Sequence, residues 1–272
     1  MLECVINISE GRDEAVIDGL RRVAGPSLLD LHHERRHNRA VLTLAGPEVE
    51  SAARAVTSLG VSTIDLRAHS GAHPRLGAVD VVPFVPLGDS TMQDAIATRD
   101  RFASWAANEL GVPCFLYGAE RSLPEVRRGA FRSLLPDVGP AEPHSTAGAI
   151  AVGARPILIA YNLWLVPGTD VSVAGEIAAE LRGPALRTLG LDLEGLAQVS
   201  MNLVDWQSLG PADAYDAVTA LALAKGTRVS AAELVGLLPE AALDAIPEGR
   251  WPELGLSRVR TIEACLRRAG FA

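Results

Sequence analysis

The sequence predicts an α/β (α+β) protein made of two similar halves. Short apolar runs bounded by glycine and proline alternate with longer segments of helical periodicity along the whole chain. With 272 residues, of which 48% are hydrophobic and 21% charged, the chain has enough apolar material for one large domain or two small ones. The order of the expected elements repeats, which favours two subdomains.

The first half begins with five elements whose boundaries follow from the hydrophobic pattern. Residues 2–8 alternate as a strand does, and residues 13–23 place apolar side chains on one face of a helix. Two further strands are expected at 27–31 and 40–45, and the polar turn between them favours a hairpin. A helix over 47–59 begins at a proline, as helices often do.

The first half continues with an apolar strand at 78–85 and a long helix at 92–110, which a threonine caps. A strand at 112–117 and a short basic helix at 124–129 are expected next. Residues 137–148 contain two prolines and two glycines. This segment is either a structured ligand loop or only a connector.

A boundary near Arg155 divides the chain into subdomains 1–155 and 156–272. The second subdomain repeats the first in outline, and this β-α-β-β-α order is typical of a duplicated ferredoxin-like unit. Its strand, helix, two strands and helix are expected, in that order, at 157–165, 171–181, 186–191, 197–203 and 211–225, with polar residues interrupting the first strand.

Two ferredoxin-like subdomains are therefore expected, each with a mixed β-sheet and with helices packed on one face. A groove between the two subdomains would be a natural ligand site. The tail is expected to be helical at 230–238 and 256–268, with Gly270 as the stop.

The charge and the cysteines limit the function classes. A net charge of −8 excludes a general nucleic-acid role, so anionic ligands require a local basic patch. Cys4, Cys114 and Cys265 are far apart in the sequence and fit reduced core thiols of a cytoplasmic protein. No apolar run is as long as a membrane span, and the N-terminus lacks a secretory pattern, so no membrane partner is expected.

The stretch from His69 to Pro86 carries the clearest functional signal. Two imidazoles, a guanidinium and two glycines precede an apolar strand. Gly71 and Pro74 exclude a helix there, so His73 is expected on a loop that is anchored to a core strand. Catalytic groups often occupy such loops, and an imidazole that titrates near neutrality suits acid and base chemistry.

Several ordered motifs resemble the formiminotransferase domain of glutamate formimidoyltransferases. They begin with an opening motif at 3–11, include a core motif at 73–80 and end at 233–239, so they cover nearly the whole chain. The other matching segments are Asn38-Arg39, Gly139-Pro140 to Gly148, Gly153 to Arg155, 158–162 and 196–203. The resemblance implies two ferredoxin-like α/β subdomains, in agreement with the repeat described above.

The resemblance also implies a reaction. A formimidoyl group passes from N-formimidoyl-L-glutamate to the co-substrate tetrahydrofolate, which gives 5-formimidoyltetrahydrofolate and L-glutamate. The family's catalytic histidine falls on His73, which would act as the general acid and base. Members of this family associate, so a cytoplasmic homodimer is expected.

The resemblance and the chemistry of the residues together suggest which groups bind the substrates. Guanidinium groups grip a carboxylate in two places, and side-chain amides can read pterin or carboxylate edges, although strand-end amides also serve structure. The expected substrate- and folate-binding residues are Asn7, Asn38, Arg39, His69, Arg75, Gly139, Pro140, His144, Ser145, Thr146, Gly148, Arg155, Asn162, Gln198 and Asn202.

Four positions depart from the pattern of the family that the chain resembles. Ala72 and His32 stand where acids are common, Ser70 stands where a second histidine is usual, and Ala147 replaces an aromatic residue. The alternative function is therefore a folate-binding paralogue without this activity, or an enzyme that acts on another one-carbon donor.

A metal site is a rival interpretation of the same histidines. His69 and His73 have the spacing of a helical zinc motif. The further ligands could come from Asp65, Asp80, His32 and His37. That spacing places both imidazoles on one face only in a helix, which the glycine and the proline disfavour. We therefore expect no metal, and a metal-dependent hydrolase of formimidoyl or amide compounds is the less favoured alternative.

Overall fold

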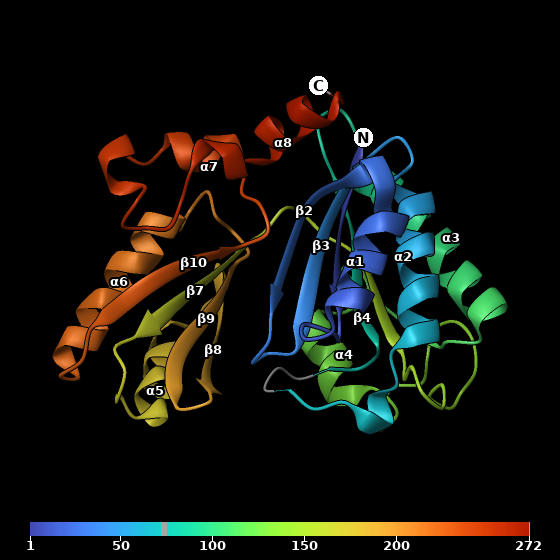
Figure 1. Cartoon of the computed structure of the whole chain (residues 1–272), viewed down its shortest axis with the longest axis horizontal. Helices are drawn as coiled ribbons and strands as arrows, with labels where there is room; N and C mark the ends of the chain where they lie inside the picture. Colours follow the sequence, from blue (N-terminus) through green and yellow to red (C-terminus); the bar gives the residue numbers. More distant parts are fainter. Residues whose placement is uncertain (72–74, 272) are drawn as a thin grey trace. The chain divides into compact units, whose positions relative to one another are not determined.

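The computed structural model describes residues 1–71 and 75–271 (Figure 1). The chain folds into two compact units, Met1–Pro156 and Ile157–Ala272, which are called unit 1 and unit 2 below. Each unit has its own β-sheet and its own hydrophobic core. The mixed α/β class that the sequence predicts is confirmed.

Unit 1 alternates strands and helices, and polar side chains set the helix ends. A capping box of Thr91 and Asp94 begins its longest helix, and the left-handed Gly111 ends that helix. Asp13 begins the first helix, because its carboxylate accepts hydrogen bonds from the first-turn amides. The elements are β1 (Leu2–Ile8), α1 (Glu14–Ala24), η1 (Gly25–Ser27), β2 (Leu28–Glu34), β3 (Arg39–Gly46), α2 (Val49–Thr63), η2 (Leu66–Ala68), β4 (Val79–Pro86), α3 (Met92–Leu110), β5 (Cys114–Tyr117), α4 (Leu123–Gly129) and β6 (Ile150–Ala154).

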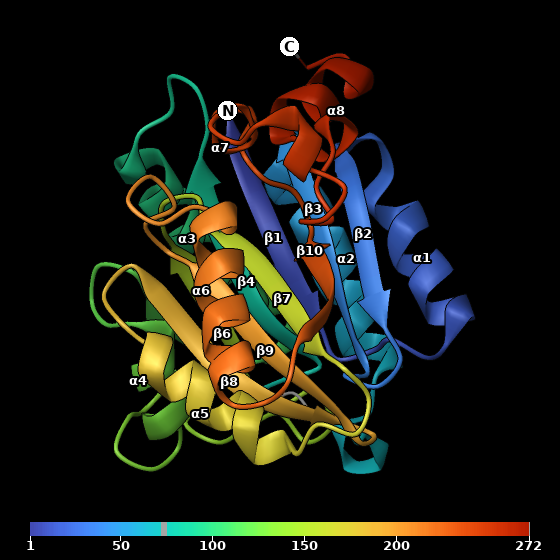
Figure 2. The same ribbon diagram turned by 90° about the vertical axis from the view of Figure 1, so that its left-hand side faces the viewer.

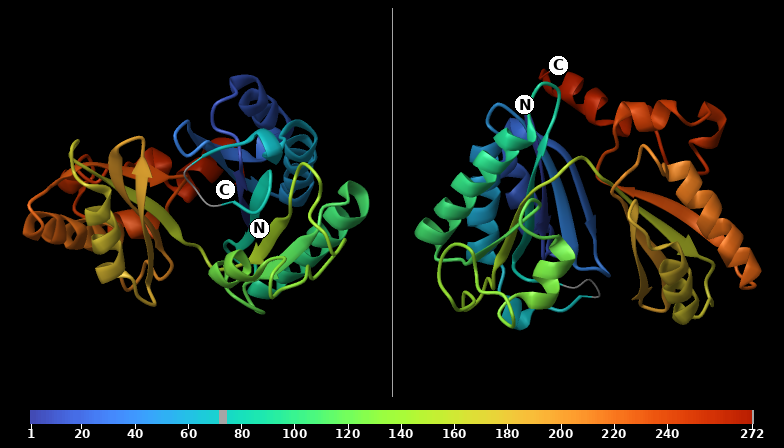
Figure 3. Two further views of the ribbon diagram at one scale, coloured as in Figure 1. Left: turned by 90° about the horizontal axis from the view of Figure 1, so that it is seen from below. Right: turned by 180° about the vertical axis from the view of Figure 1, so that it is seen from behind.

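The sheet of unit 1 has the strand order β2-β3-β1-β4-β6-β5. Strands β2, β3, β1 and β4 pair antiparallel, whereas β4, β6 and β5 pair parallel. The antiparallel part has the β-α-β-β-α-β connections of a ferredoxin-like unit, and β6 and β5 extend the sheet beyond β4. The right-hand view of Figure 3 shows α2 and α3 along one face of this sheet.

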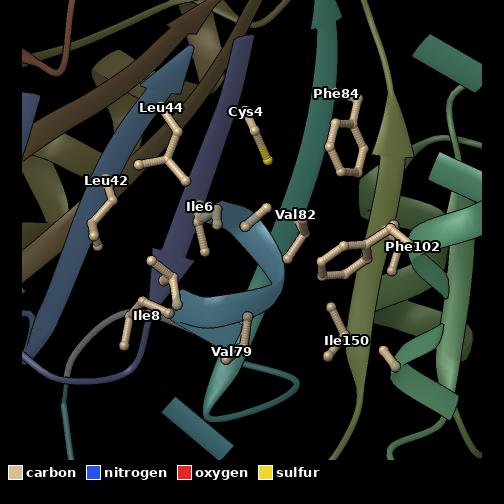
Figure 4. Packing of buried hydrophobic residues seen from close by; sticks show 14 of the residues in the cluster. Cys4, Ile6, Ile8, Leu42, Leu44, Val79, Val82, Phe84, Phe102 and Ile150 are labelled. Atoms are coloured by element: carbon tan, nitrogen blue, oxygen red, sulfur yellow. The ribbon is translucent and has the colours of Figure 1, made fainter. Parts of the chain in front are cut away.

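The main core of unit 1 lies between that face and helices α1 to α3. Alternate residues of β1 (Cys4, Ile6 and Ile8) point into it, as Figure 4 shows. Phe84 on β4 meets Phe102 on α3 edge to face, with 5.6 Å between the ring centroids. Because side chains alternate across a strand, the intervening residues of β1 and β3 lie on the opposite face.

Helix α4 packs on this opposite face, over β5 and β6. Its Val126 belongs to a second apolar cluster with Val81, Phe115, Tyr117 and Ala151. The helix that carries the basic pair Arg127-Arg128 is therefore fixed by its own apolar face.

Unit 2 repeats the same connections on a smaller sheet. Its strand order is β10-β7-β9-β8, and all neighbouring strands are antiparallel. Helices α5 and α6 lie over one face, as Figure 2 shows, and alternate residues of β7 and β9 point toward them. The elements are β7 (Ile159–Leu165), α5 (Val171–Leu181), β8 (Leu186–Leu193), β9 (Leu196–Leu203), α6 (Pro211–Ala224), β10 (Val229–Val235), α7 (Glu240–Asp244), η3 (Glu248–Arg250), η4 (Arg258–Arg260) and α8 (Ile262–Ala269).

The helix expected at 230–238 is wrong, because Val229–Val235 forms β10 and pairs with β7. Alanine, glutamate and leucine favour a helix locally, but pairing with a buried strand outweighs that preference. This strand completes the ferredoxin-like unit.

Two further boundaries in unit 2 differ from expectation. Strand β7 runs unbroken through Tyr161 and Asn162, since both residues pair with β9. The tail helix begins at Ile262 rather than near residue 256, because Thr261 caps it and a short 3₁₀ turn precedes it.

The cysteines are buried and unbridged, as the sequence predicts. Burial raises the pKa of Cys4 well above its usual value and that of Cys114 to about 12, so both thiols stay protonated at neutral pH. No helix within residues 1–71 and 75–271 is long and apolar enough to cross a membrane.

Candidate active site

Most of the polar residues singled out in unit 1 gather at one end of its sheet. At this end β1 and β2 finish, and β3, β4 and β6 begin. Ile8 pairs with both Ala40 and Val79, and Val81 is opposite Ala151 in the β4–β6 register. We call this region the site end. Loops from five strands leave the sheet here, so polar groups that are distant in sequence come together.

Asn38 ties the turn before β3 to the neighbouring loops. Its Oδ1 accepts a hydrogen bond from the Gly11 amide at 2.9 Å, and its Nδ2 donates to the Ser70 carbonyl at 3.0 Å. Asn38 has a φ of 49°, which asparagine tolerates better than most residues. A Cβ on Gly11 would lie only 2.5 Å from the Arg39 amide nitrogen, so the close approach requires glycine. Asn38 therefore holds the start of β3 against the loop that contains Ser70.

Arg75 anchors the loop that leads into β4. Its Nη2 donates to the His37 carbonyl at 3.4 Å, and its Nη1 contacts the His69 ring, 3.0 Å from Nε2 and closer to Nδ1. A guanidinium group can only donate, so the His69 nitrogen that it meets carries a lone pair. Burial and the charge of Arg75 lower the pKa of His69, which keeps this imidazole neutral at pH 7.

Asp80 is a buried carboxylate that joins the start of β4 to α4. Its Oδ2 accepts a hydrogen bond from Arg127 Nη2 at 2.6 Å, and its Oδ1 accepts one from Arg127 Nη1 at 3.3 Å. Oδ1 also accepts the Leu76 amide at 2.6 Å. The Asp80 side chain is 4% exposed, so its negative charge depends on these donors.

Arg39 is a half-buried cation that has no comparable partner in the described part of the chain. It begins β3 on the face opposite the core residue Ala40. Its Nε is buried without an acceptor, and no described residue forms an ion pair with its guanidinium group. Burial lowers the pKa of Arg39 to about 10; Asp80 opposes this lowering, whereas Arg127 and Arg75 contribute to it. Arg39 is still charged at pH 7.

The charges of this group add up to a cationic site. Arg39, Arg75 and Arg127 act on one another and on the carboxylate of Asp80. In a chain with a net charge of −8, this surplus is the local basic patch that an anionic ligand requires. Asn7 adds a buried acceptor, because its Oδ1 has no hydrogen-bond partner.

The last part of the 139–148 segment forms a tight turn at the site end. The backbones of His144 and Gly148 exchange hydrogen bonds of 2.8 and 2.9 Å. His144 Nδ1 accepts the amides of Thr146 and Ala147 at 3.3 and 3.1 Å, so the ring proton of the neutral imidazole is on Nε2. His144 and Thr146 therefore shape this turn, and Ser145 is exposed on it.

Two glycines let this turn approach β4. A Cβ on Gly77 would lie 2.0 Å from the Ala149 carbonyl oxygen, and one on Gly148 would lie 2.5 Å from the Leu76 carbonyl oxygen. Ser9 Oγ donates to the Gly77 carbonyl at 2.8 Å from the β1 side. Backbone packing thus explains why these two positions are glycine.

Gly139 and Pro140 do not join this group. Gly139 packs against Ala107 and Pro113 beside the start of β5, and Pro140 is exposed. Strand β5 is four positions from β3 in the sheet, which is about 19 Å at the usual strand spacing. The two ends of the 139–148 segment therefore serve different parts of unit 1.

Arg155 lies at the opposite end of the same sheet, after β6. Its amide donates to the Phe84 carbonyl at 3.1 Å, and its Nη1 donates to the Pro156 carbonyl at 2.9 Å. Burial raises the pKa of Tyr117 to about 12, and the positive charge of Arg155 opposes this rise. Arg155 and Tyr117 thus form a separate polar pair.

The amide residues expected in unit 2 lie on the sheet face opposite the one that α5 and α6 cover. Gln198 is fully buried, and neither of its amide atoms has a hydrogen-bond partner. Asn162 Nδ2 donates to Glu233 Oε2 at 3.1 Å, and Asn202 is exposed. Gln198 thus places a buried amide without a described hydrogen-bond partner on this face.

His73, Ala72 and Pro74 lie outside the described residues. The catalytic role of His73 therefore stays a prediction from the sequence. Across the two described ranges, no group of three or more histidine, cysteine, aspartate or glutamate side chains is arranged to hold a metal ion.

The sequence does not single out Arg127. Asp80 stands out in the sequence because it is a charged residue inside the apolar run 78–85, and a buried carboxylate needs a partner. Arg127 and Arg128 are adjacent on α4, and only the fold determines that Arg127 reaches Asp80.

The fold and the site define a class: an α/β chain of two ferredoxin-like units with a cationic end suited to a small anionic ligand. Residues 1–155 match the formiminotransferase domain, N-terminal subdomain, and residues 160–248 match the formiminotransferase domain. The chain belongs to the formiminotransferase family.

Curated relatives are similar over most of this chain. It is 36% identical to a glutamate formimidoyltransferase of Streptococcus pyogenes, with 91% of this chain and 92% of the relative covered. It is 32% identical to a glutamate formimidoyltransferase of Thermoplasma acidophilum, with 89% of each protein covered. It is also 35% identical to the formimidoyltransferase-cyclodeaminase of Sus scrofa, of which it covers 51% against 90% of its own length. The chain thus spans about half the length of that two-function relative.

Proposed function

We propose that this chain is a glutamate formimidoyltransferase, which transfers the formimidoyl group of N-formimidoyl-L-glutamate to tetrahydrofolate. The products are 5-formimidoyltetrahydrofolate and L-glutamate. The observation that carries the proposal is the similarity to two glutamate formimidoyltransferases over about nine-tenths of both proteins. Tetrahydrofolate is a co-substrate that is consumed in each turnover.

The charge of the site end supports this proposal. Both substrates carry carboxylates, and bidentate pairing with guanidinium groups holds a carboxylate in a fixed orientation. Arg39 and Arg75 belong to the cationic group, in which Arg127 already neutralises Asp80. Fixing both substrates is the main requirement, because the reaction joins two molecules at one carbon.

The reaction requires proton transfer between two amines. The folate amine attacks the formimidoyl carbon and must lose a proton, and the bond from that carbon to the glutamate nitrogen then breaks. The departing amine gains a proton. One group that first accepts a proton and then returns it therefore balances the reaction. We assign this role to His73 on the strength of the family motif. His69 beside Arg75 is a neutral neighbour that orients substrate.

The remaining expected ligands fall into two sets. Asn7 and Asn38 belong to the site end, whereas Asn162, Gln198 and Asn202 belong to one sheet face of unit 2. We propose that Arg155, at the opposite end of the sheet, binds the tail carboxylates of folate. The pterin and these carboxylates are at opposite ends of the folate molecule. The buried amides of Asn7 and Gln198 supply groups for ligand recognition.

We further propose that the boundary after Arg155 separates two formiminotransferase subdomains, and that the protein is a cytoplasmic homodimer. The division of the chain near Pro156 supports the boundary. Light scattering at micromolar concentration measures the assembly, and a mass near one chain contradicts the dimer.

The activity is tested with purified protein, N-formimidoyl-L-glutamate and tetrahydrofolate. Mass spectrometry follows glutamate release and the folate product over time. Equal amounts of both products, with none when tetrahydrofolate is omitted, are expected. Release of glutamate when tetrahydrofolate is omitted would indicate a hydrolase. Folate binding measured by calorimetry, with no turnover, would indicate a binding protein.

A further inference from the structure

Arg39 carries a positive charge with which no described residue forms an ion pair. Its Nε is buried and has no acceptor among the described residues. Removing a charge from water without a partner costs free energy, so the folded protein holds this group at a cost to stability. Asp80, the carboxylate that acts on Arg39, is already held by Arg127 and by the Leu76 amide.

The backbone of Arg39 is fixed before any ligand binds. Its neighbour Asn38 is hydrogen-bonded to Gly11 on one side and to Ser70 on the other. The backbones of Glu34 and Arg39 are opposite each other in the β2–β3 strand pair. A cation on a rigid frame loses little conformational freedom when it binds an anion, which increases affinity and selectivity.

Arg39 follows two residues that contact the described residues flanking the motif histidine in the sequence. Asn38 Nδ2 holds the Ser70 carbonyl, and Arg75 Nη2 donates to the His37 carbonyl. The described residues on both sides of position 73 are therefore attached to the two residues that precede Arg39.

The chemistry of the substrates separates three kinds of carboxylate. In the donor, only the amine nitrogen and the α-carbon lie between the formimidoyl carbon and the α-carboxylate. The γ-carboxylate is further away along a flexible chain, and the folate tail lies beyond an aminobenzoyl ring from the reacting amine. The α-carboxylate is thus the anion that reaches a rigid cation beside the reacting segment.

We propose that Arg39 binds the α-carboxylate of the formimidoyl donor and so selects donors derived from α-amino acids. This inference rests on the proposed function, which it makes more specific. The donor supplies the partner that the folded chain lacks, and the guanidinium group orients the nitrogen that leaves.

The test compares Arg39→Gln with the parent on three donors. These are N-formimidoyl-L-glutamate, N-formimidoyl-4-aminobutyrate without the α-carboxylate, and N-formimidoyl-L-2-aminobutyrate without the γ-carboxylate. Arg39→Gln is expected to raise KM about 10- to 100-fold for both donors that have the α-carboxylate. For the donor without it, the variant and the parent are expected to agree within about threefold. KM for tetrahydrofolate is expected to stay unchanged.

Two further variants control this comparison. Arg39→Lys keeps the charge but loses the two-pronged geometry, so its KM is expected between those of the parent and Arg39→Gln. Arg22→Gln removes an exposed arginine of α1 and is expected to behave as the parent does. Thermal unfolding without substrates is expected to give an equal or higher melting temperature for Arg39→Gln, because an uncompensated charge is lost.

The outcomes separate this inference from the proposed function. A parent that releases no glutamate from any donor contradicts the proposed function. With an active parent, equal losses on all three donors, a loss that follows the γ-carboxylate, or a raised KM for tetrahydrofolate overturns the Arg39 assignment. A melting temperature several degrees lower for Arg39→Gln would make Arg39 structural and would also overturn it.

Discussion

Asp80 and Arg127 form a bidentate ion pair across 47 residues of sequence, with 2.6 Å between Oδ2 and Nη2. The pair fastens α4 to the start of β4, and Asp80 also accepts a hydrogen bond from the Leu76 amide, four residues before it. It therefore connects the cationic site to the apolar cluster beneath α4.

The first prediction concerns the free energy of this pair. Asp80→Asn should lower the free energy of unfolding by about 2–3 kcal/mol, because Arg127 is left without its carboxylate. A double-mutant cycle with Arg127→Gln, measured by urea unfolding, should give a coupling above about 1 kcal/mol. The exposed pair Arg21–Asp18 is the matched control and should couple close to zero. Equal couplings for the two pairs would contradict the assignment.

The second prediction concerns His73. His73→Ala should lower kcat by about 10²- to 10⁴-fold, because proton transfer between the two amines loses its general acid and base. Folate affinity should stay within a few-fold. His69→Ala should cost much less, and His33→Ala on the helix-covered face of β2 is the control. Turnover of formimidoyl-glutamate measures the effect, and a His73→Ala variant with most of the parental activity would refute the role.

The third prediction concerns the pH dependence of stability. Burial and Arg75 lower the pKa of His69 in the folded protein, while Glu10 opposes them. The unfolded chain, with a histidine pKa of about 6.5, therefore binds protons more readily than the folded chain. The contribution of His69 to stability is present above pH 6.5 and is lost as the pH falls below that value.

The measurement is the melting temperature of the parent and His69→Gln between pH 5 and 8. The parent should lose more stability on acidification than the variant does. Arg75→Gln removes one cause of the lowered pKa and should raise the midpoint of the His69 imidazole signal in an NMR titration. A slope identical in parent and His69→Gln would show that this histidine titrates alike in both states.

The fourth prediction concerns Arg155. Arg155→Lys should weaken folate binding by about 1–3 kcal/mol, since lysine lacks the forked geometry that holds a tail carboxylate. Calorimetry with folate measures the affinity, and Arg132→Lys at an exposed position is the control. Unchanged affinity with intact folding would leave Arg155 only its contacts to the carbonyls of Phe84 and Pro156.

Local sequence determines much of the fold. The bounds of α3 follow from the cap at Thr91 and from Gly111, since the backbone groups at a helix end need partners that nearby residues supply. The repeated β-α-β-β-α order follows from alternating and helical hydrophobic periods, which depend only on neighbours. The motif around residues 69–80 likewise indicates the family and one part of the site, because reactive residue types are visible in the sequence.

The tertiary structure alone determines the contacts between distant segments. It makes 229–235 a strand, because hydrogen bonds to β7 outweigh the helical preference of its residues. It also selects Arg127 rather than Arg128 as the partner of Asp80 and gives Arg39 no ion pair with any described residue, although all three are equally basic in the sequence. The reason is physical: burial and pairing are properties of a charge's surroundings in space, and these surroundings come from strands and loops far apart along the chain.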